Sequence, residues 1–585
     1  MDKLNLNGIS MTTILGISCY YHDAAASIVK DGKILAAVTE ERFSRRKHDY
    51  DFPINAINFC LGQAGIKSNE LDYVIFHEKP FVKFERLLMT ILETFPKSST
   101  VFRESMLSWL KDKLWIKTTI AEKLGIKDTS KILFSDHHVS HAASSFLCSP
   151  FKEAAIITAD AVGEWTTATI GIGKDNKINL LKELRFPHSF GLLYSAVTAF
   201  LGFEVNEGEY KVMGLAPFGK PKYKDKIYKL VNIADDGSFS LDMKYFMFHR
   251  STDKMFNKEF EKLFGKPCPP EDREKIIPYY ADIAASIQEV MEEMLIKMAN
   301  HAYELTKMEN LCFAGGVALN SKANYRILNE TPFKNLFIQP AAGDDGGSLG
   351  AALFAYYSLL ENNRDPEKTV LRNVYLGEEH NEGSIKKFLG ENKISYKYFG
   401  NEEEFLEEIV KRIMKEEVIG WFQGRFEWGP RALGNRSIIA DPRNPEMKDI
   451  VNKKIKFREP FRPFAPSVLA EKASKFFELP AIKDFYPIRF MTYVVPVKED
   501  KRKIIPAVTH VDGTGRLQIV FKDDNPRYYK LIEKFEKKTG VPVIMNTSFN
   551  LKGEPIVNTP KDAYSSFMRS GMDAVALEKF VVTKT

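Results

Sequence analysis

Short apolar runs near the N-terminus predict β-strands. Residues 13–18, 25–30 and 33–39 are runs of this kind. Asp31 and Gly32 separate the last two runs and are a strong signal for a tight hairpin, because both residue types tolerate positive φ. The pattern therefore predicts an antiparallel β-unit at the start of the chain.

The same pattern recurs from residue 153. The run EAAIITADAVGEWTTATIGIG again predicts a strand, an acidic turn and a strand, and its Asp160 is placed much as Asp23 is in the first unit. Mostly helical segments, 54–64 and 84–125, lie between the two units. Two similar halves that each begin with an antiparallel β-unit are typical of the fold class shared by actin, sugar kinases and heat-shock chaperone ATPases.

A long amphipathic stretch, residues 276–307, predicts a helix that is followed by a buried strand and a glycine turn. Gly315 and Gly316 in that turn would let the backbone approach a phosphate at the start of a helix. Tight packing of the strand against the helix explains the two glycines equally well. A helix over 348–361 closes this half.

A polar segment with little periodicity, residues 361–380, predicts a linker. We therefore expect two domains, residues 1–365 and 372–585. The second domain mixes a predicted helix with predicted strands, over 402–416 and over 417–422, 489–496, 516–521 and 541–545 respectively.

Composition narrows the class of protein. The chain has 585 residues, 44% hydrophobic and 27% charged, which is typical of globular proteins of two to four domains. Five scattered cysteines without a CxxC pair argue against a disulfide framework and fit a reducing cytoplasm. No apolar run approaches the ~20 residues that span a bilayer, and the polar start MDKLNLNGIS is no signal peptide, with Met11 as an alternative first residue. A net charge of +6 suits phosphorylated small molecules and does not by itself indicate nucleic acid.

A histidine pair is the first candidate for chemistry. His137 and His141 are four residues apart, so a helix would place them on one face. Asp344, in the later run GDDGGSLG, would complete a facial site of two histidines and one carboxylate. The alternative is an incidental pair with no ligand.

A basic segment, residues 425–462, is the second candidate. It holds ten basic residues against five acidic ones, interleaved with Gly, Pro and aromatics. Arginine is favoured where phosphate or carboxylate oxygens are bound in a planar, bidentate way. We expect a pocket for such oxygens, and the alternative is a solvated basic face. The candidate residues are Arg431, Arg436, Lys456, Arg458 and Arg462.

Two later polar segments add hydrogen-bonding groups. Residues 509–516 form a rigid polar loop that ends in Arg516, and residues 546–550 follow a predicted strand. Amide and hydroxyl groups at a strand end suit a nucleotide or a carbamoyl group, although turn chemistry alone is the other explanation.

Ten motifs occur in order and together resemble a known family. They are HDAAAS, EERFSRRKHD, DHHVSHAASSF, GEYKVMGLAPFG, FAGGVALN, GDDGGSLG, GPRALGNRS, FREPFRPFAP, THVDGTGR and NTSFNLKGEPIV. The chain resembles the O-carbamoyltransferases of nodulation-factor and antibiotic biosynthesis, which include the cephalosporin and tobramycin carbamoylating enzymes. The resemblance covers nearly the whole chain.

The resemblance implies a fold for each domain. The first would be an α/β domain of the duplicated actin-like (ASKHA) type, similar to the universal tRNA threonylcarbamoyl-transfer protein. The second would be an α+β domain similar to the YrdC type, which forms a carbamoyl-adenylate. The Lys-x-Arg and Ser-x-Asn pattern of that type is matched by Lys456 with Arg458 and by Ser548 with Asn550.

The resemblance also implies a two-step reaction. ATP and carbamoyl phosphate would give carbamoyl-adenylate in the second domain, and an acceptor hydroxyl would take the carbamoyl group in the first. His137, His141 and Asp344 match the family's metal ligands, with iron(II) expected and zinc or manganese also compatible with the donor set.

Further roles follow from the same resemblance. His22 would be a general base or would orient the acceptor hydroxyl, and Lys47 would hold the acceptor or a phosphate. The alternatives are a structural histidine and a solvated lysine. In the first domain the nucleotide would be held by Asp160, Gly315, Gly316 and Asn320. In the second domain carbamoyl phosphate and ATP would be held by Arg431, Lys456, Arg458, Arg462, Arg516, Ser548 and Asn550.

The expected partner is a small-molecule or sugar hydroxyl, without nucleic acid and without membrane insertion, and a homodimer is one option. Two other functions compete with this hypothesis. Threonylcarbamoyl-adenylate chemistry on tRNA would use the same domain types, but the chain lacks a long basic face interleaved with aromatics. A non-catalytic nucleotide-binding module would leave the arginine-rich segment unexplained. The sequence leaves the identity of the acceptor open.

Overall fold

The first sheet of the protein is built on the predicted N-terminal β-unit. The computed structural model describes residues 11–111, 113–479 and 486–584, so residues 1–10, where we expected no leader, lie outside the described part. The sheet has the strand order β3-β2-β1-β4-β5, with β1 antiparallel to β2 and parallel to β4. Asp31 (φ 49°) and Gly32 (φ 75°) form the predicted tight turn. The strands are β1 (Thr13–Ser18), β2 (Ala25–Lys30), β3 (Lys33–Thr39), β4 (Tyr73–Phe76) and β5 (Ile132–Phe134).

A second sheet repeats this arrangement and confirms the predicted duplication. Its order is β8-β7-β6-β11-β12, with β6 antiparallel to β7 and parallel to β11. The strands are β6 (Glu153–Ala159), β7 (Thr166–Lys174), β8 (Lys177–Arg185), β11 (Asn310–Ala314) and β12 (Asn335–Phe337).

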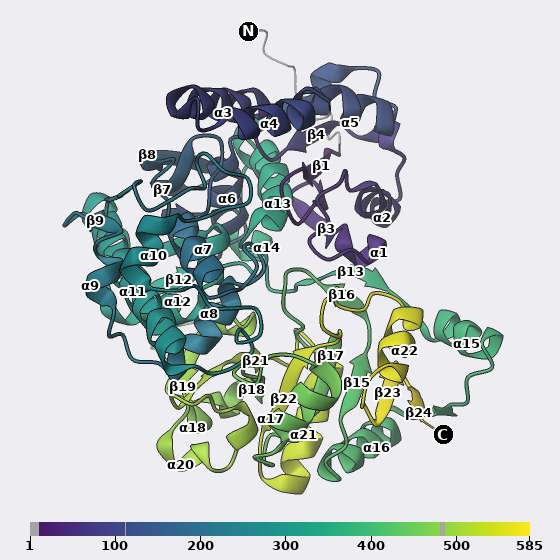
Figure 1. Cartoon of the computed structure of the whole chain (residues 1–585). Coiled ribbons are helices and arrows are strands. Elements are labelled where there is room, and N and C mark those ends of the chain that lie inside the picture. The colour runs from purple at the N-terminus through teal and green to yellow at the C-terminus, as the bar shows by residue number, and fades with distance from the viewer. Residues whose placement is uncertain (1–10, 112, 480–485, 585) are drawn as a thin grey trace.

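Two helices lie between the sheets (Figure 1). They are α6 (His137–Phe146) and α13 (Asp344–Phe354), and they pack directly on each other. A Cβ at Gly350 of α13 would lie 1.9 Å from the Ser140 carbonyl oxygen of α6, and one at Gly16 of β1 would lie 1.9 Å from the Ser348 carbonyl oxygen of α13. Only glycine permits such close backbone approach, so these residues set the spacing between α13, α6 and the first sheet.

Other helices cover the outer faces. The helix predicted over 276–307 is α11 (Pro278–Thr306), and the predicted helix 54–64 is α2 (Ile54–Ala64). The helical segment predicted over 84–125 is three α-helices, and Pro96 lies between the first two. They are α3 (Pro80–Thr94), α4 (Ser99–Lys111) and α5 (Ile116–Leu124).

The second domain is built on one mixed sheet of eight strands. Its order is β14-β24-β23-β15-β17-β22-β18-β21. The strands are β14 (Lys397–Tyr398), β15 (Ile419–Phe422), β17 (Arg436–Ala440), β18 (Ala465–Leu469), β21 (Gln518–Val520), β22 (Val543–Ser548), β23 (Ala574–Leu577) and β24 (Phe580–Thr583). The covering helices include α15 (Glu382–Glu391), α16 (Glu402–Met414), α21 (Pro526–Thr539) and α22 (Pro560–Met568).

Three local predictions differ from the structure. The strand predicted over 489–496 was wrong in its first part, because α19 (Tyr486–Arg489) precedes a short strand, β19 (Val494–Pro496). The last helix of the first domain begins at Asp344, four residues earlier than predicted. The predicted linker contains α14 (Pro366–Thr369) and β13 (Tyr375–Glu379), which pairs with β16 (Arg425–Glu427).

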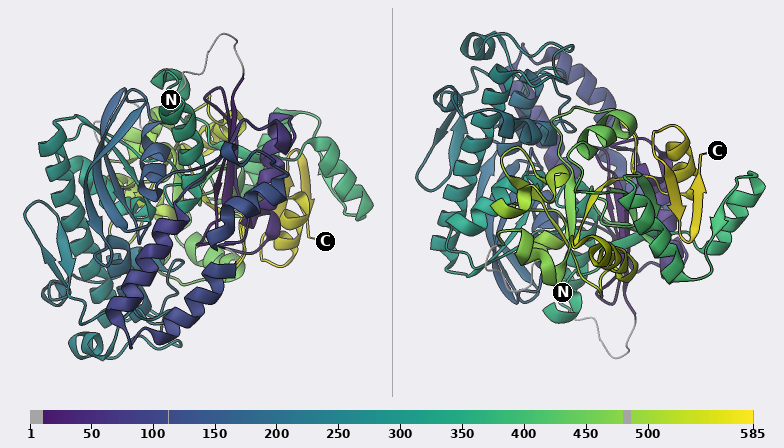
Figure 2. Two further views of the ribbon diagram at one scale, coloured as in Figure 1. Left: turned by 90° about the horizontal axis from the view of Figure 1, so that it is seen from above. Right: turned by 90° about the horizontal axis from the view of Figure 1, so that it is seen from below.

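The two domains are packed against each other, and they overlap when the molecule is viewed from above or below (Figure 2). One hydrophobic core cluster contains residues of both domains. Phe203 of the first domain lies 6.1 Å from Phe461 of the second, ring centre to ring centre, and Asn324 donates a 3.0 Å hydrogen bond to the Thr492 carbonyl. Within the described part of the chain, we find no helix with the length and apolarity to cross a membrane.

Candidate functional site

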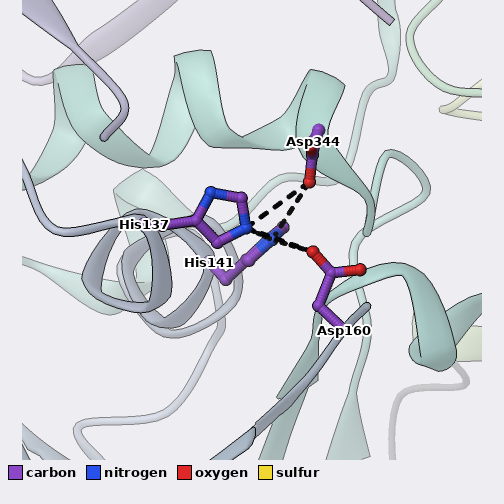
Figure 3. Close-up of side chains that lie close together, drawn as sticks. All are labelled: His137, His141, Asp160 and Asp344. Atoms are coloured by element: carbon purple, nitrogen blue, oxygen red, sulfur yellow. Dashed lines mark hydrogen bonds and ion pairs between the residues drawn. The ribbon is translucent and has the colours of Figure 1, made fainter. Parts of the chain in front are cut away.

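Four buried side chains form a cluster where α6 meets α13 (Figure 3). His137 and His141 are one turn apart on α6, Asp160 follows the end of β6, and Asp344 is the first residue of α13. Asp160 Oδ2 lies 3.1 Å from His137 Nε2 and 3.3 Å from His141 Nε2. Asp344 Oδ1 lies 3.6 and 3.4 Å from the same two nitrogens. Two nitrogens and two oxygens therefore converge within 4.8 Å of one another.

The chemistry of the cluster fits a divalent metal ion. The two Nε2 atoms are 3.1 Å apart, and both Asp344 oxygens are buried without a hydrogen-bond partner among the residues that the structure describes. Burial disfavours charge on His137, but Asp344 and Asp160 outweigh it and raise its pKa well above the usual range. Two charged imidazoles at 3.1 Å would repel each other, whereas a cation ligated by neutral imidazoles would satisfy all four groups. A set of two imidazoles and two carboxylates is compatible with iron(II), zinc or manganese.

Asp160 is a candidate ligand that the sequence analysis assigned to the nucleotide. The structure places Asp160 between the histidine pair and the glycine turn. Its Oδ2 faces the histidines, and its Oδ1 accepts a 3.2 Å hydrogen bond from the Gly316 backbone N–H. Its position at the end of the first strand of the repeated β-unit was visible in the sequence. The sequence did not indicate that this strand end approaches α6, because that approach depends on long-range packing.

Two buried carboxylates that the sequence analysis missed support the histidines. Glu164 accepts a 3.0 Å hydrogen bond from the His137 backbone N–H and so places negative charge at the start of α6. Glu78 Oε2 lies 3.7 Å from His137 Nδ1 and accepts a 2.6 Å hydrogen bond from Lys83. These contacts fix the first turn of α6, which carries the first ligand.

His22 lies at the edge of the cluster. Its Nε2 is 3.8 Å from Asp344 Oδ2, and its Nδ1 is 3.1 Å from Asp23 Oδ2. Burial opposes the charge, but the carboxylates of Asp344 and Asp23 raise the pKa of His22 to about 10. A general base must be neutral, so His22 is suited to that task only when the negative charge of Asp344 is engaged by another cation.

His48 is joined to this histidine through Asp23, and its neighbour in sequence, Lys47, makes a separate ion pair. His48 Nδ1 is 2.8 Å from Asp23 Oδ1, so Asp23 joins the rings of His22 and His48. Lys47 pairs with Glu207 in the loop before α8 (Glu209–Leu215). Lys47 is thus held in an ion pair, in contrast to the solvated lysine that was the alternative.

The glycine turn after β11 shows the close packing that was one of its two explanations. Gly315 has φ 94°, and a Cβ there would lie 2.1 Å from the Ala159 carbonyl oxygen. Asn320 Oδ1 accepts a 3.2 Å hydrogen bond from the Ala323 N–H and so caps α12 (Ser321–Glu330). The binding of a nucleotide by Gly315, Gly316 and Asn320 stays a prediction.

A pocket lined by cations lies between the two domains. Four arginines that the sequence analysis selected line it, together with Ser548 and with Tyr210, Phe218 and Lys322 of the first domain. Burial lowers the pKa of Arg431 to about 10, and burial together with the neighbouring Arg462 lowers the pKa of Arg458 well below its usual range. Crowded guanidinium groups of this kind favour a bound anion. The four are Arg431, Arg458, Arg462 and Arg516.

Lys456 organises one wall of this arginine pocket. Its ammonium donates hydrogen bonds of 2.8 Å to the Ser548 carbonyl and 2.7 Å to Asn550 Oδ1. The predicted Lys-x-Arg and Ser-x-Asn segments are therefore in contact, with Lys456 holding the end of β22. Arg458 stacks over Phe464 at 4.6 Å.

Arg436 corrects one expectation of the sequence analysis, which placed it in the pocket. The side chain is fully buried under the sheet, where it stacks on Phe422 at 3.7 Å and donates a 2.6 Å hydrogen bond to the Gln423 carbonyl. Backbone carbonyls accept hydrogen bonds from its Nη1 and Nη2 groups, so its role is structural.

Comparisons with known proteins match two successive parts of the chain to one family. The family model "Carbamoyltransferase N-terminus" matches residues 13–353, and "Carbamoyltransferase C-terminus" matches residues 410–584. The uncharacterized protein sll1178 of Synechocystis is 48% identical, covering 98% of this chain and 97% of its own. Nodulation protein NolNO of Sinorhizobium fredii is 36% identical, covering 100% of this chain and 81% of its own. Among solved structures, full-length HypF in a phosphate- and nucleotide-bound form is 13% identical with a TM-score of 0.35, covering 60% of this chain and 56% of its own.

Proposed function

This chain belongs to the carbamoyltransferase family and is a carbamoyltransferase, and from that premise we propose that it is an ATP-dependent O-carbamoyltransferase. Carbamoyl phosphate would supply the carbamoyl group, ATP would activate it, and a hydroxyl of a small molecule or sugar would receive it. The observation that carries the proposal is the presence, in one chain, of a buried metal-type cluster and a separate arginine pocket.

The arginine pocket supports the activating step. Carbamoyl phosphate with water would release phosphate, and the carbamate oxygen would attack the α-phosphorus of ATP, so that pyrophosphate leaves and carbamoyl-adenylate forms. Both substrates are anions that repel each other, and preorganised cations relieve this repulsion in the transition state. Arg431, Arg458 and Arg516, which line the pocket, would bind such phosphate oxygens, and Lys456 contacts Ser548 and Asn550 beside them. A YrdC-like fold for this domain is part of the proposal.

The histidine-carboxylate cluster supports the transfer step. His137, His141, Asp160 and Asp344 would hold the metal ion, which is iron(II) by family resemblance and would supply Lewis-acid stabilisation of a phosphate or carbonyl oxygen. His22 would take the proton of the acceptor hydroxyl at Nε2, the nitrogen that faces Asp344. The hydroxyl oxygen would bond to the carbamoyl carbon as the bond to the AMP oxygen breaks.

The acceptor and the compartment complete the proposal. Relatives named as nodulation proteins support a small-molecule or sugar acceptor. Five free, buried cysteines are in keeping with a reducing cytoplasm.

Exchange of labelled pyrophosphate into ATP tests the activating step without any acceptor. We expect exchange that requires carbamoyl phosphate in the iron(II)-loaded protein. Exchange that requires threonine and bicarbonate instead would favour the tRNA-type chemistry. A folded, metal-loaded protein that exchanges under neither condition would overturn the proposal.

A further inference from the structure

Helix α1 (Glu41–Ser44) and the four residues after it lie between the two sites. Figure 1 shows α1 at the edge of the first domain that faces the second, close to β13. We refer to residues 41–48 as the bridge segment. One side of it contacts the second domain, and the other carries Lys47, which pairs with Glu207, and His48, which contacts Asp23.

Arg45 attaches the bridge segment to the second domain. Its guanidinium donates hydrogen bonds of 2.7 Å to the Ile556 carbonyl and 2.9 Å to the Pro555 carbonyl, and its Nε lies 3.5 Å from Asp562 Oδ1. Arg45 itself has a left-handed backbone (φ 59°) that ends α1 and turns the chain toward Lys47. A planar guanidinium with two parallel donors fixes orientation as well as distance.

Arg42 makes a second attachment. The side chain is 4% exposed, stacks on Phe426 at 4.4 Å and donates a 3.3 Å hydrogen bond to the Gly429 carbonyl. It also pairs with Glu41 at 3.1 Å within the bridge segment. The segment is thus held at two points of the second domain that are far apart in sequence.

The first of these points adjoins a lining segment of the arginine pocket in sequence, and the second is connected to the pocket wall through hydrogen bonds. Gly429 directly precedes Pro430 and Arg431, which line the pocket. Pro555 follows Glu554, whose carbonyl accepts a 2.8 Å hydrogen bond from Asn550. Asn550 in turn accepts the 2.7 Å hydrogen bond from Lys456. A ligand that orders these loops would therefore also order the backbone carbonyls to which Arg42 and Arg45 donate hydrogen bonds.

The other side of the bridge segment reaches the cluster. Glu41 Oε2 accepts a 3.0 Å hydrogen bond from the His48 backbone N–H, so the arginine-paired carboxylate also positions His48. His48 contacts Asp23, and Asp23 contacts His22. The contacts are continuous from the pocket loops to the histidine that faces Asp344.

We propose that Arg42 and Arg45 are positioning residues through which an anion bound in the arginine pocket orders His48, which is connected to the metal-type cluster through Asp23 and His22. This inference rests on the proposed function and adds a physical link between its two steps. Acceptor-side groups become ordered when the activated carbamoyl group is present. Such a link would limit loss of the adenylate to water by making transfer to the acceptor faster. Small errors of position at a reacting centre reduce the rate by large factors, so ordered acceptor-side groups favour transfer.

Hydrogen–deuterium exchange of the bridge segment tests the link without an acceptor. The probes are α,β-methylene-ATP and carbamoyl phosphate added to the whole protein. In the wild type we expect amides of residues 41–48 to exchange about tenfold more slowly with the probes present, because local ordering raises the free energy of opening. In R45Q this protection should be largely absent, and R45K, which keeps the charge but lacks the planar fork, should lie between them.

A matched control separates the link from local damage. Arg569 pairs with Glu554 of the same loop but lies wholly in the second domain and is 54% exposed. R569Q should keep the wild-type protection of residues 41–48. Pyrophosphate exchange in R45Q should stay within about threefold of wild type, which shows that the second domain is folded.

The outcomes are distinguishable. If the wild type lacks carbamoyl phosphate-dependent pyrophosphate exchange, the proposed function fails. If the wild type exchanges but residues 41–48 are not protected, or are protected equally in R45Q, the proposed link fails while the function stands.

Discussion

The two sites of this protein differ in how their buried charges are balanced. In the first domain, two histidines and two aspartates face one another and partly balance their own charges. Between the two domains, six cations line one pocket, and among its described lining residues Asp512 is the one acid. A balanced cluster holds together before its ligand arrives, whereas an excess of buried cations is costly until anions bind. The difference predicts two ligands of opposite sign, a metal cation and a phosphorylated anion.

Removal of a histidine should have the largest effect on activity and should show that the two sites serve different steps. We expect H137A to lower acceptor carbamoylation by at least 10²- to 10³-fold, the size of effect seen when one electrostatic stabiliser of a transition state is lost. Pyrophosphate exchange should stay within about threefold of wild type. Loss of exchange in a folded H137A protein would show that the cluster also serves the first step.

Removal of a pocket arginine should give the reverse pattern. R458A deletes one of the crowded guanidinium groups, and we expect pyrophosphate exchange to fall about 10²-fold because phosphate charge is left unpaired. The metal content, measured by atomic emission, should equal that of wild type. R569A, at an exposed ion pair in the same domain, is the control and should exchange normally.

The role of Asp160 can be tested through the metal itself. D160N keeps the shape of the side chain but removes its charge, so we expect metal affinity to fall about 10- to 100-fold. The measurement is competition for the ion with a chelator of known affinity. A metal affinity equal to that of wild type would instead favour the role in nucleotide binding that the family resemblance implied for Asp160.

The smallest effect concerns pH and a pocket histidine. Burial, reinforced by Arg516, lowers the pKa of His510 to about 4, below the ~6.5 of an unfolded chain. Folding therefore favours the neutral ring, and its contribution to stability is present above pH 6.5 and is lost as the pH falls toward 4. Urea unfolding at several pH values should show a shallower loss for H510N than for wild type. Equal slopes would show that His510 does not couple folding to pH.

Local chemistry made much of the fold predictable. The strands from Thr13 to Thr39 were predicted correctly because short apolar runs and an Asp-Gly turn act within a few residues. The duplication was predictable because the same pattern recurs. The strand predicted over 489–496 was partly wrong because an apolar run of this length does not distinguish a buried helix from a strand.

Sites were predictable where spacing alone brings groups together. His137 and His141 share a helical face in any α-helix that contains them. Arg436 was misplaced because a buried arginine and a pocket arginine have the same sequence signal, and only the packing of Phe422 and the backbone carbonyls around it decides between them. The network through Arg45 spans more than 500 residues of sequence, so no local pattern could indicate it.

The shared core of the two domains has a consequence for how the chain unfolds. Phe203 packs on Phe461, and the same apolar cluster continues through both domains. Separation of the domains would expose this surface to water, so each domain stabilises the other. The chain should melt in a single calorimetric transition, and a cut at residues 361–374 should yield fragments that remain associated rather than two independent enzymes.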